Sequence, residues 1–121
     1  MNAFIDWNIL LDVKGGPNQV ENFCDAPIMY DTVNHKMDKK LSYDYIGHFS
    51  RYIKPGAKRI AFSKYTSKLE MTALKNPNGN IIVVFMNKEN EKTPVAIRIN
   101  GKVTYIEVPS NSIMTGIIEN I

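Results

Sequence analysis

In residues 81–108, IIVVFMNKENEKTPVAIRINGKVTYIEV, two patterns typical of β-strands follow one another. Residues 81–86 are apolar without interruption, which indicates a central strand that is buried on both faces. In residues 95–99, Val and Ile alternate with Ala and Arg, which indicates a strand with one face in water. Asn100-Gly101 then separates two alternating runs, and both residue types tolerate the positive φ of a type I′ turn. This stretch therefore predicts a buried strand followed by a β-hairpin.

The same period of two extends over the rest of the chain after Gly56. Six strands are predicted, at residues 58–63, 68–74, 81–86, 95–99, 103–108 and 113–118. The sequence NPNGN at residues 76–80 is a strong turn signal between two of them. Six short strands with turns between them predict a mainly β fold, an antiparallel β-sandwich.

Only one helix is predicted, at residues 41–53. Ser42 can cap it through its hydroxyl, and Asp44 lies in the favourable first turn. Gly47 costs about 1 kcal/mol relative to alanine in a helix interior, so either it packs closely against a neighbour or its presence there is neutral. Lys54-Pro55-Gly56 ends the helix. The apolar face consists of Tyr45, Ile46, Phe49, Tyr52 and Ile53.

The amino-terminal residues predict a strand that needs neighbours. MNAFIDWNILL, residues 1–11, reads as one strand of about eight residues, buried on both faces as in a parallel sheet. It does not resemble a signal peptide, because no Lys or Arg precedes the apolar residues, which Asp6 and Asn8 interrupt. Nothing near it supplies a parallel partner, so we expect this strand to come from something larger.

A short hairpin is predicted after the loop at residues 12–22. Its strands are residues 26–31 and 35–37, with a turn at residues 32–34. Pro27 near the start indicates an edge strand.

Composition and charge exclude several classes of function. The 121 residues contain one cysteine and two histidines without metal-ligand spacing, so we predict neither a disulfide framework nor a metal site nor a cofactor. The net charge is +3, with weak basic clusters at residues 37–40 and 54–59, and we expect no nucleic-acid partner. No apolar stretch reaches about 18 residues, so no membrane span is predicted.

Three motifs, in this order and spacing, resemble the carboxyl-terminal part of family 30 glycoside hydrolases, the glucosylceramidase relatives. They are WNILLDVKGGPN at residues 7–18, NFCDAPI at residues 22–28 and YIGHFSRYIKPG at residues 45–56. Residues 73–79 and 83–87 are similar to strands near the end of that family. The resemblance covers almost the whole chain.

The resemblance implies a TIM barrel with an attached β-sandwich. Phe4–Asn8 would be the last barrel strand, and the helix at residues 41–53 the last barrel helix, docked on the barrel. The implied domains are 1–57, with the barrel remnants and hairpin, and 58–121, the β-sandwich.

The resemblance also implies a site. The family's retaining mechanism uses two glutamates on earlier barrel strands, and neither has a counterpart in this chain, so no catalytic residue is expected here. Trp7 resembles the sugar-platform tryptophan of the family, and Asn22 an asparagine near the glucose site. Asp6 and Asn8 are weaker candidates. The implied substrate of the full-length enzyme is a β-glucoside or a glucosylceramide-like lipid.

Two hypotheses remain open from the sequence. The first is a fragment of a glucosylceramidase-like hydrolase that is inactive alone. The second is a non-catalytic carbohydrate-binding or interaction module of the β-sandwich type. A third hypothesis concerns assembly: the exposed amino-terminal strand and the apolar helix face predict either a homodimer or disorder of roughly the first 12 residues.

Overall fold

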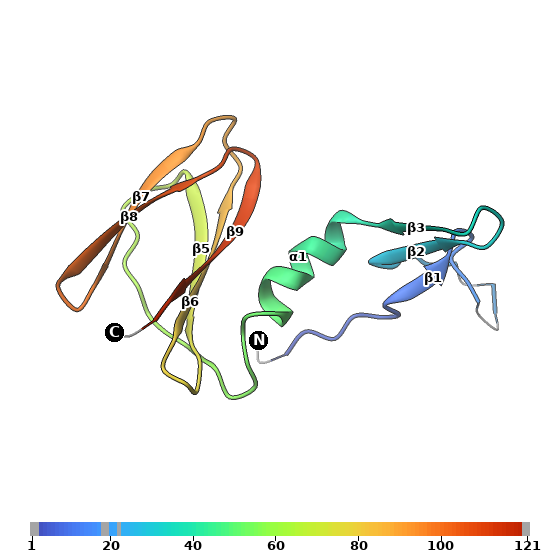
Figure 1. Ribbon diagram of the computed structural model, residues 1–121, viewed down its shortest axis with the longest axis horizontal. Helices are drawn as coiled ribbons and strands as arrows, with labels where there is room; N and C mark the ends of the chain where they lie inside the picture. Colours follow the sequence, from blue (N-terminus) through green and yellow to red (C-terminus); the bar gives the residue numbers. More distant parts are fainter. Residues whose placement is uncertain (1–2, 18–19, 22, 120–121) are drawn as a thin grey trace. The chain divides into compact units, whose positions relative to one another are not determined.

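The computed structural model describes residues 3–17, 20–21 and 23–119 (Figure 1). The chain divides into two compact units, Met1–Ile46 and Gly47–Ile121, and the boundary falls inside α1 (Leu41–Ser50). The structure is mostly β, with one helix in the described part of the chain, as the sequence predicts.

The first unit contains a three-stranded sheet in the order β1-β2-β3. β1 (Leu10–Asp12) runs parallel to β2 (Ile28–Asp31), which pairs antiparallel with β3 (Lys36–Lys39). The predicted hairpin is thereby confirmed. Pro27 does not mark an edge strand, because β2 lies between the other two strands. Since Pro27 precedes β2, its missing N–H costs no hydrogen bond of the sheet.

The predicted strand at the amino terminus is wrong in position and burial. The described residues before Leu10 form no strand, and β1 has only three residues. Phe4, Ile5 and Ile9 are exposed rather than buried on two faces. The physical reason is the absence of a partner: none of the described strands pairs with Phe4–Asn8, and an unpaired strand gains neither hydrogen bonds nor cover.

The helix begins where it is predicted, but its capping residue and its carboxyl-terminal end differ from the prediction. It begins at Leu41, and the Tyr43 N–H donates to the Lys40 carbonyl at 2.9 Å, so Ser42 lies inside the helix rather than at its cap. It ends at Ser50, although the Ile53 N–H still donates to the Phe49 carbonyl at 3.0 Å. A methyl group on Gly47 would meet nothing within 4 Å, so close packing at this glycine is not found among the described residues.

The second unit is a β-sandwich, which confirms the predicted fold class. Figure 1 shows one sheet facing the β7–β8 hairpin. The four-stranded sheet has the order β4-β5-β6-β9, and all its pairs are antiparallel. The strands are β4 (Lys58–Arg59), β5 (Leu69–Lys75), β6 (Ile81–Asn87), β7 (Thr93–Ile99), β8 (Lys102–Val108) and β9 (Ser112–Ile118).

β6 is central and buried on both faces, as its apolar sequence predicts. Val83 and Phe85 contribute to the core between the sheets, while Ile82 and Val84 on the opposite face are also buried. On that opposite face the His48 ring nitrogen Nδ1 lies 2.8 Å from the Thr115 hydroxyl of β9. The Thr115 hydroxyl can in turn donate to the His48 carbonyl at 3.4 Å, which gives His48 a structural role.

The turns of the sandwich follow the predicted residues. Asn100 and Gly101 have φ values of 49° and 79°, which confirms a turn with two positive φ angles between β7 and β8. β4 is shorter than predicted, since the chain leaves the sheet after Ile60, whose side chain packs on the core.

Within the described residues, no helix has the length and apolarity that a membrane crossing requires.

Candidate functional site

The amino-terminal segment holds three of the four predicted site residues. The Trp7 side chain is 75% exposed, and its backbone N–H donates to Oδ1 of Asp6 at 2.8 Å. Asn8 follows with a φ of 33°, in the left-handed region. Asn22, the fourth predicted residue, lies outside the described residues. The structure therefore places Asp6, Trp7 and Asn8 in one exposed, irregular segment that leads into β1.

The loop after β1 is organised by the carboxylate of Asp12. Its Oδ1 accepts the backbone N–H groups of Lys14 at 2.8 Å and of Gly16 at 3.0 Å. The Asp12 N–H donates to the Gly16 carbonyl at 2.7 Å, which closes the loop. The sequence predicts only a loop for this segment. The available signal was an aspartate shortly before two glycines, which is typical of a side-chain-stabilised turn.

Gly15 allows the backbone of Cys24 to lie against the loop after β1. Its φ is 81°, and a Cβ there would lie 2.5 Å from the carbonyl oxygen of Cys24 and 2.8 Å from its nitrogen. The Cys24 N–H donates to the Gly15 carbonyl at 3.3 Å. Only glycine fits this position, because both the backbone angle and the close approach exclude a side chain.

The hairpin turn after β2 is held by Asp31. Its carboxylate accepts hydrogen bonds from the Asn34 side chain at 2.7 Å and from the backbone N–H groups of Asn34 and Val33. These bonds, the Asn34 side chain first, lower the pKa of Asp31 below its usual value. Beside the turn, the Tyr30 hydroxyl lies 3.2 Å from Nδ1 of His35. These groups stabilise a turn and show no arrangement for catalysis.

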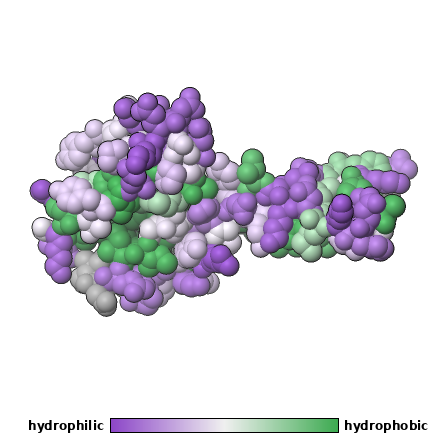
Figure 2. All heavy atoms as spheres, turned by 45° about the horizontal axis from the view of Figure 1, so that its top comes forward, coloured by the Kyte–Doolittle hydropathy of each residue, from purple (hydrophilic) through white to green (hydrophobic). Residues whose placement is uncertain are grey.

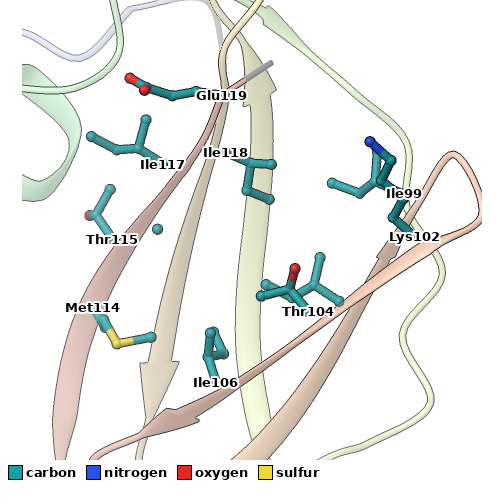
Figure 3. Close-up of a pocket in the computed structure, with 11 residues that line it drawn as sticks. Ile99, Lys102, Thr104, Ile106, Met114, Thr115, Ile117, Ile118 and Glu119 are labelled. Atoms are coloured by element: carbon teal, nitrogen blue, oxygen red, sulfur yellow. The ribbon is translucent and has the colours of Figure 1, made fainter. Parts of the chain in front are cut away.

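The sandwich contains a mostly apolar cavity between its two sheets, with a volume of about 450 Å³. Figure 3 shows Ile106 and Thr104 of β8 facing Met114 and Ile118 of β9, while Ile117 points away. The lining also includes two charged residues, Lys102 and Glu119. This cavity could not be predicted from the sequence, because it depends on how two sheets pack and not on a local pattern.

A metal centre finds no support in the described residues. They contain no group of three or more His, Cys, Asp or Glu side chains that could hold a metal ion. The segment before β1 offers instead an exposed indole beside a carboxylate and an amide, so that a flat apolar surface lies next to hydrogen-bonding groups.

Most of the chain matches two models of one protein family. Residues 1–53 match the Glycosyl hydrolase family 30 TIM-barrel domain, and residues 56–116 match the Glycosyl hydrolase family 30 beta sandwich domain.

Sequence relatives carry related names. The chain is 37% identical over 98 residues to the lysosomal acid glucosylceramidase of Mus musculus, which covers 80% of this chain and 19% of that protein. It is 38% identical over 90 residues to the putative glucosylceramidase 1 of Caenorhabditis elegans, which covers 73% of this chain and 17% of that protein. The chain thus spans about a fifth of the length of the curated relatives that it matches.

Solved structures agree with this relationship in fold. SrfJ from Salmonella typhimurium superposes with a TM-score of 0.87 at 35% identity, covering 98% of this chain and 26% of that one. The endo-beta1,6-glucanase BT3312 superposes with a TM-score of 0.82 at 26% identity, covering 90% of this chain and 25% of that one. The chain is a glucosylceramidase-like segment that belongs to glycosyl hydrolase family 30.

Proposed function

We propose that this chain is the part of a retaining β-glycoside hydrolase that supplies one wall of the sugar site and the attached β-sandwich. The observation that carries the proposal is the match of both family 30 models along one chain. It is supported by the exposed indole of Trp7, which lies in the part that matches the TIM-barrel model. The substrate that we propose for the whole enzyme is a β-glucoside, and in particular a glucosylceramide-like lipid.

The chemistry assigns different tasks to different parts of such an enzyme. A retaining glycosidase holds two carboxyl groups about 5 Å apart, one as nucleophile and one as acid and base. We propose that both belong to other barrel strands, so these residues by themselves do not hydrolyse glycosides. Trp7 would cover the apolar C–H face of the sugar, because an indole offers a large flat apolar surface. The side-chain amide of Asn22 would donate a hydrogen bond to a sugar hydroxyl or accept one from it.

A graft tests the role of Trp7. This chain replaces the matching part of the mouse lysosomal acid glucosylceramidase, to which it is 37% identical. The substitution Trp7→Ala is then made in the hybrid enzyme. We expect kcat/KM for a β-glucoside to fall about tenfold or more, which corresponds to about 1.4 kcal/mol of lost transition-state binding.

The matched control is Tyr65→Ala, which removes a 97% exposed aromatic side chain from the sandwich. This variant should keep kcat/KM within about twofold, since the removal of an isolated exposed side chain usually has a small effect. Equal kcat/KM values for the Trp7→Ala hybrid and its parent would refute the proposed role of Trp7.

A non-catalytic carbohydrate-binding module is the second candidate, favoured by exposed aromatic side chains in the described part of the sandwich. Tyr105 projects from β8 with 81% of its surface exposed. Because Trp7 is the only tryptophan in the sequence, its fluorescence reports sugar binding near it directly. Saturable binding of oligosaccharides by the isolated chain, abolished by Trp7→Ala or Tyr105→Ala, would support this candidate. If no binding is found at millimolar sugar, the first proposal, a part of a β-glycoside hydrolase, is favoured.

A further inference from the structure

The inner face of the β7–β8 hairpin changes from buried to exposed along its length. Thr93 pairs with Val108 at one end of the hairpin, and Ile99 pairs with Lys102 at the other. Val108 is buried and Lys102 is exposed, although both lie on the same face because side chains alternate along β8. A lysine therefore lies on the face that a sandwich normally fills with apolar side chains.

The cavity between the sheets lies at this exposed end, and Gly116 of β9 gives it room. Met114 and Ile118, two residues before and after Gly116, line the cavity and pack on the core. Gly116 lies between them on the same face. A Cβ at Gly116 would meet the Phe85 ring only at 3.7 Å, which is ordinary van der Waals contact. The position thus leaves space that a side chain could occupy.

The walls of the cavity favour a hydrocarbon chain. The volume of about 450 Å³ lies within the range of about 300–1,000 Å³ that is usual for small-molecule sites. The half-buried side chains of Ile97, Ile99 and Ile106 supply apolar walls. Water finds few hydrogen-bond partners in such a space, and apolar cavities of proteins bind apolar molecules. Figure 2 shows apolar surface among hydrophilic residues on the sandwich.

The ammonium group of Lys102 indicates the charge of the head group. No ion pair forms to Lys102 within the described part of the chain. Glu119 also lines the cavity, but Figure 3 shows its carboxylate on the side of β9 to which Ile117 points, away from Lys102. That carboxylate accepts a hydrogen bond from the Asn80 side chain at 3.3 Å. Thr104, two residues after Lys102 on the same face, adds a hydroxyl to the lining. The cation and the hydroxyl together complement an anion.

We propose that this cavity binds one molecule of a medium-chain fatty acid. The hydrocarbon chain lies among the isoleucines and Met114, and the carboxylate lies at Lys102. The two oxygens of a carboxylate match one ammonium group and one hydroxyl, and a hydrogen bond between charged partners is stronger than one between neutral groups. The ligand is a single molecule inside the sandwich, and Trp7 takes no part in binding it. The proposal is therefore independent of the proposed function.

Calorimetric titration of the isolated chain tests the charge of the ligand. The probe is decanoate, below the concentration at which it forms micelles, and we expect saturable one-to-one binding. Decyltrimethylammonium, which has the same chain and a cationic head, should bind about fivefold more weakly or worse. Lys102→Met should weaken decanoate binding about threefold, as expected for one ion pair at an exposed position. The matched control Lys88→Met removes an exposed lysine outside the cavity lining and should bind decanoate within about twofold of the parent.

A second variant tests the location of the ligand by filling the cavity. Gly116→Val adds a side chain that suits a strand on the inner face of β9. It should weaken decanoate binding about tenfold or more, because a close-packed interior has no room for both groups. If circular dichroism shows that this variant is unfolded, Thr104→Phe, at an exposed position of the lining, replaces it and should weaken binding about threefold or more.

Three results would overturn the proposal. The first is equal binding of decanoate and decyltrimethylammonium, and the second is decanoate binding that persists unchanged in the filled variant. The third is the absence of saturable binding, which is the result expected if another polypeptide segment or a second copy of the chain fills the cavity. Because the titration contains no sugar, its failure leaves the role of Trp7 untouched, and a failure of the Trp7 graft leaves the titration standing.

Discussion

Two glycines of this chain have opposite roles at the scale of single residues. Gly15 has a φ of 81° and lies so close to the backbone of Cys24 that a Cβ would collide with it. Gly47 lies inside α1 with open space around it. A glycine of the first kind is required by the fold, whereas one of the second kind only weakens a helix.

A pair of substitutions tests this difference. Gly15→Ala should lower the free energy of unfolding by about 1–3 kcal/mol, because alanine is strained at this backbone angle and has no space. Gly47→Ala should raise it by up to about 1 kcal/mol. Denaturant unfolding of both variants measures the change. Equal effects of the two substitutions would contradict the assignment.

Asp31 gives a prediction for the dependence of stability on pH. Hydrogen bonds from Asn34 and Val33 lower its pKa in the folded chain below 3.8, its ordinary value. The stability that this carboxylate contributes is therefore fully present above pH 3.8 and is lost as the pH falls through the lower folded pKa. The free energies of unfolding of the parent and of Asp31→Asn should differ at pH 6 and converge in strong acid. A difference that stays constant down to strong acid would show that the carboxylate charge plays no part.

At the scale of elements, the strands after Gly56 could be predicted from sequence and the amino-terminal strand could not. The alternation in β7 and the turn at Asn100-Gly101 are local signals, since side-chain direction and positive φ are properties of consecutive residues. The state of Phe4–Asn8 depends on whether another strand lies beside it, which no local pattern specifies. Trp7 could be named from the family resemblance, whereas the cavity between the sheets depends on their packing.

Asn87 connects several elements of the sandwich. The side chain is 1% exposed, and its Nδ2 donates to the carbonyls of Glu91, Val108 and Pro109 at 2.8, 3.2 and 2.9 Å. Asn87→Ala should lower the free energy of unfolding by about 1–3 kcal/mol, because three carbonyls lose their donor and that of the buried Val108 is shielded from water.

The control for this measurement is Asn90→Ala, at an exposed position nearby. Its side chain accepts one exposed hydrogen bond, from Asn111, so we expect a change within about 0.5 kcal/mol. If thermal unfolding showed equal losses for both asparagines, Asn87 would not be the connecting residue that its contacts indicate.

At the scale of the whole molecule, the exposed apolar side chains of the amino-terminal segment predict self-association. Phe4, Ile5 and Ile9 are all exposed, and an apolar surface of this kind tends to be covered by a partner. Light scattering of the isolated chain should show a mass that rises with concentration, and Ile5→Asp with Ile9→Asp should reduce the rise. A constant monomer mass at every concentration would argue against the homodimer.

We propose that these residues take part in glycoside hydrolysis only together with other barrel strands. This proposal can be tested by incubating the isolated chain with a chromogenic β-glucoside. We expect no release of chromophore above the uncatalysed rate. Saturable turnover would contradict it, and turnover that persisted after Asp6, Asp12, Glu21, Asp25 and Asp31 were changed to amides would place the reactive groups elsewhere in this chain.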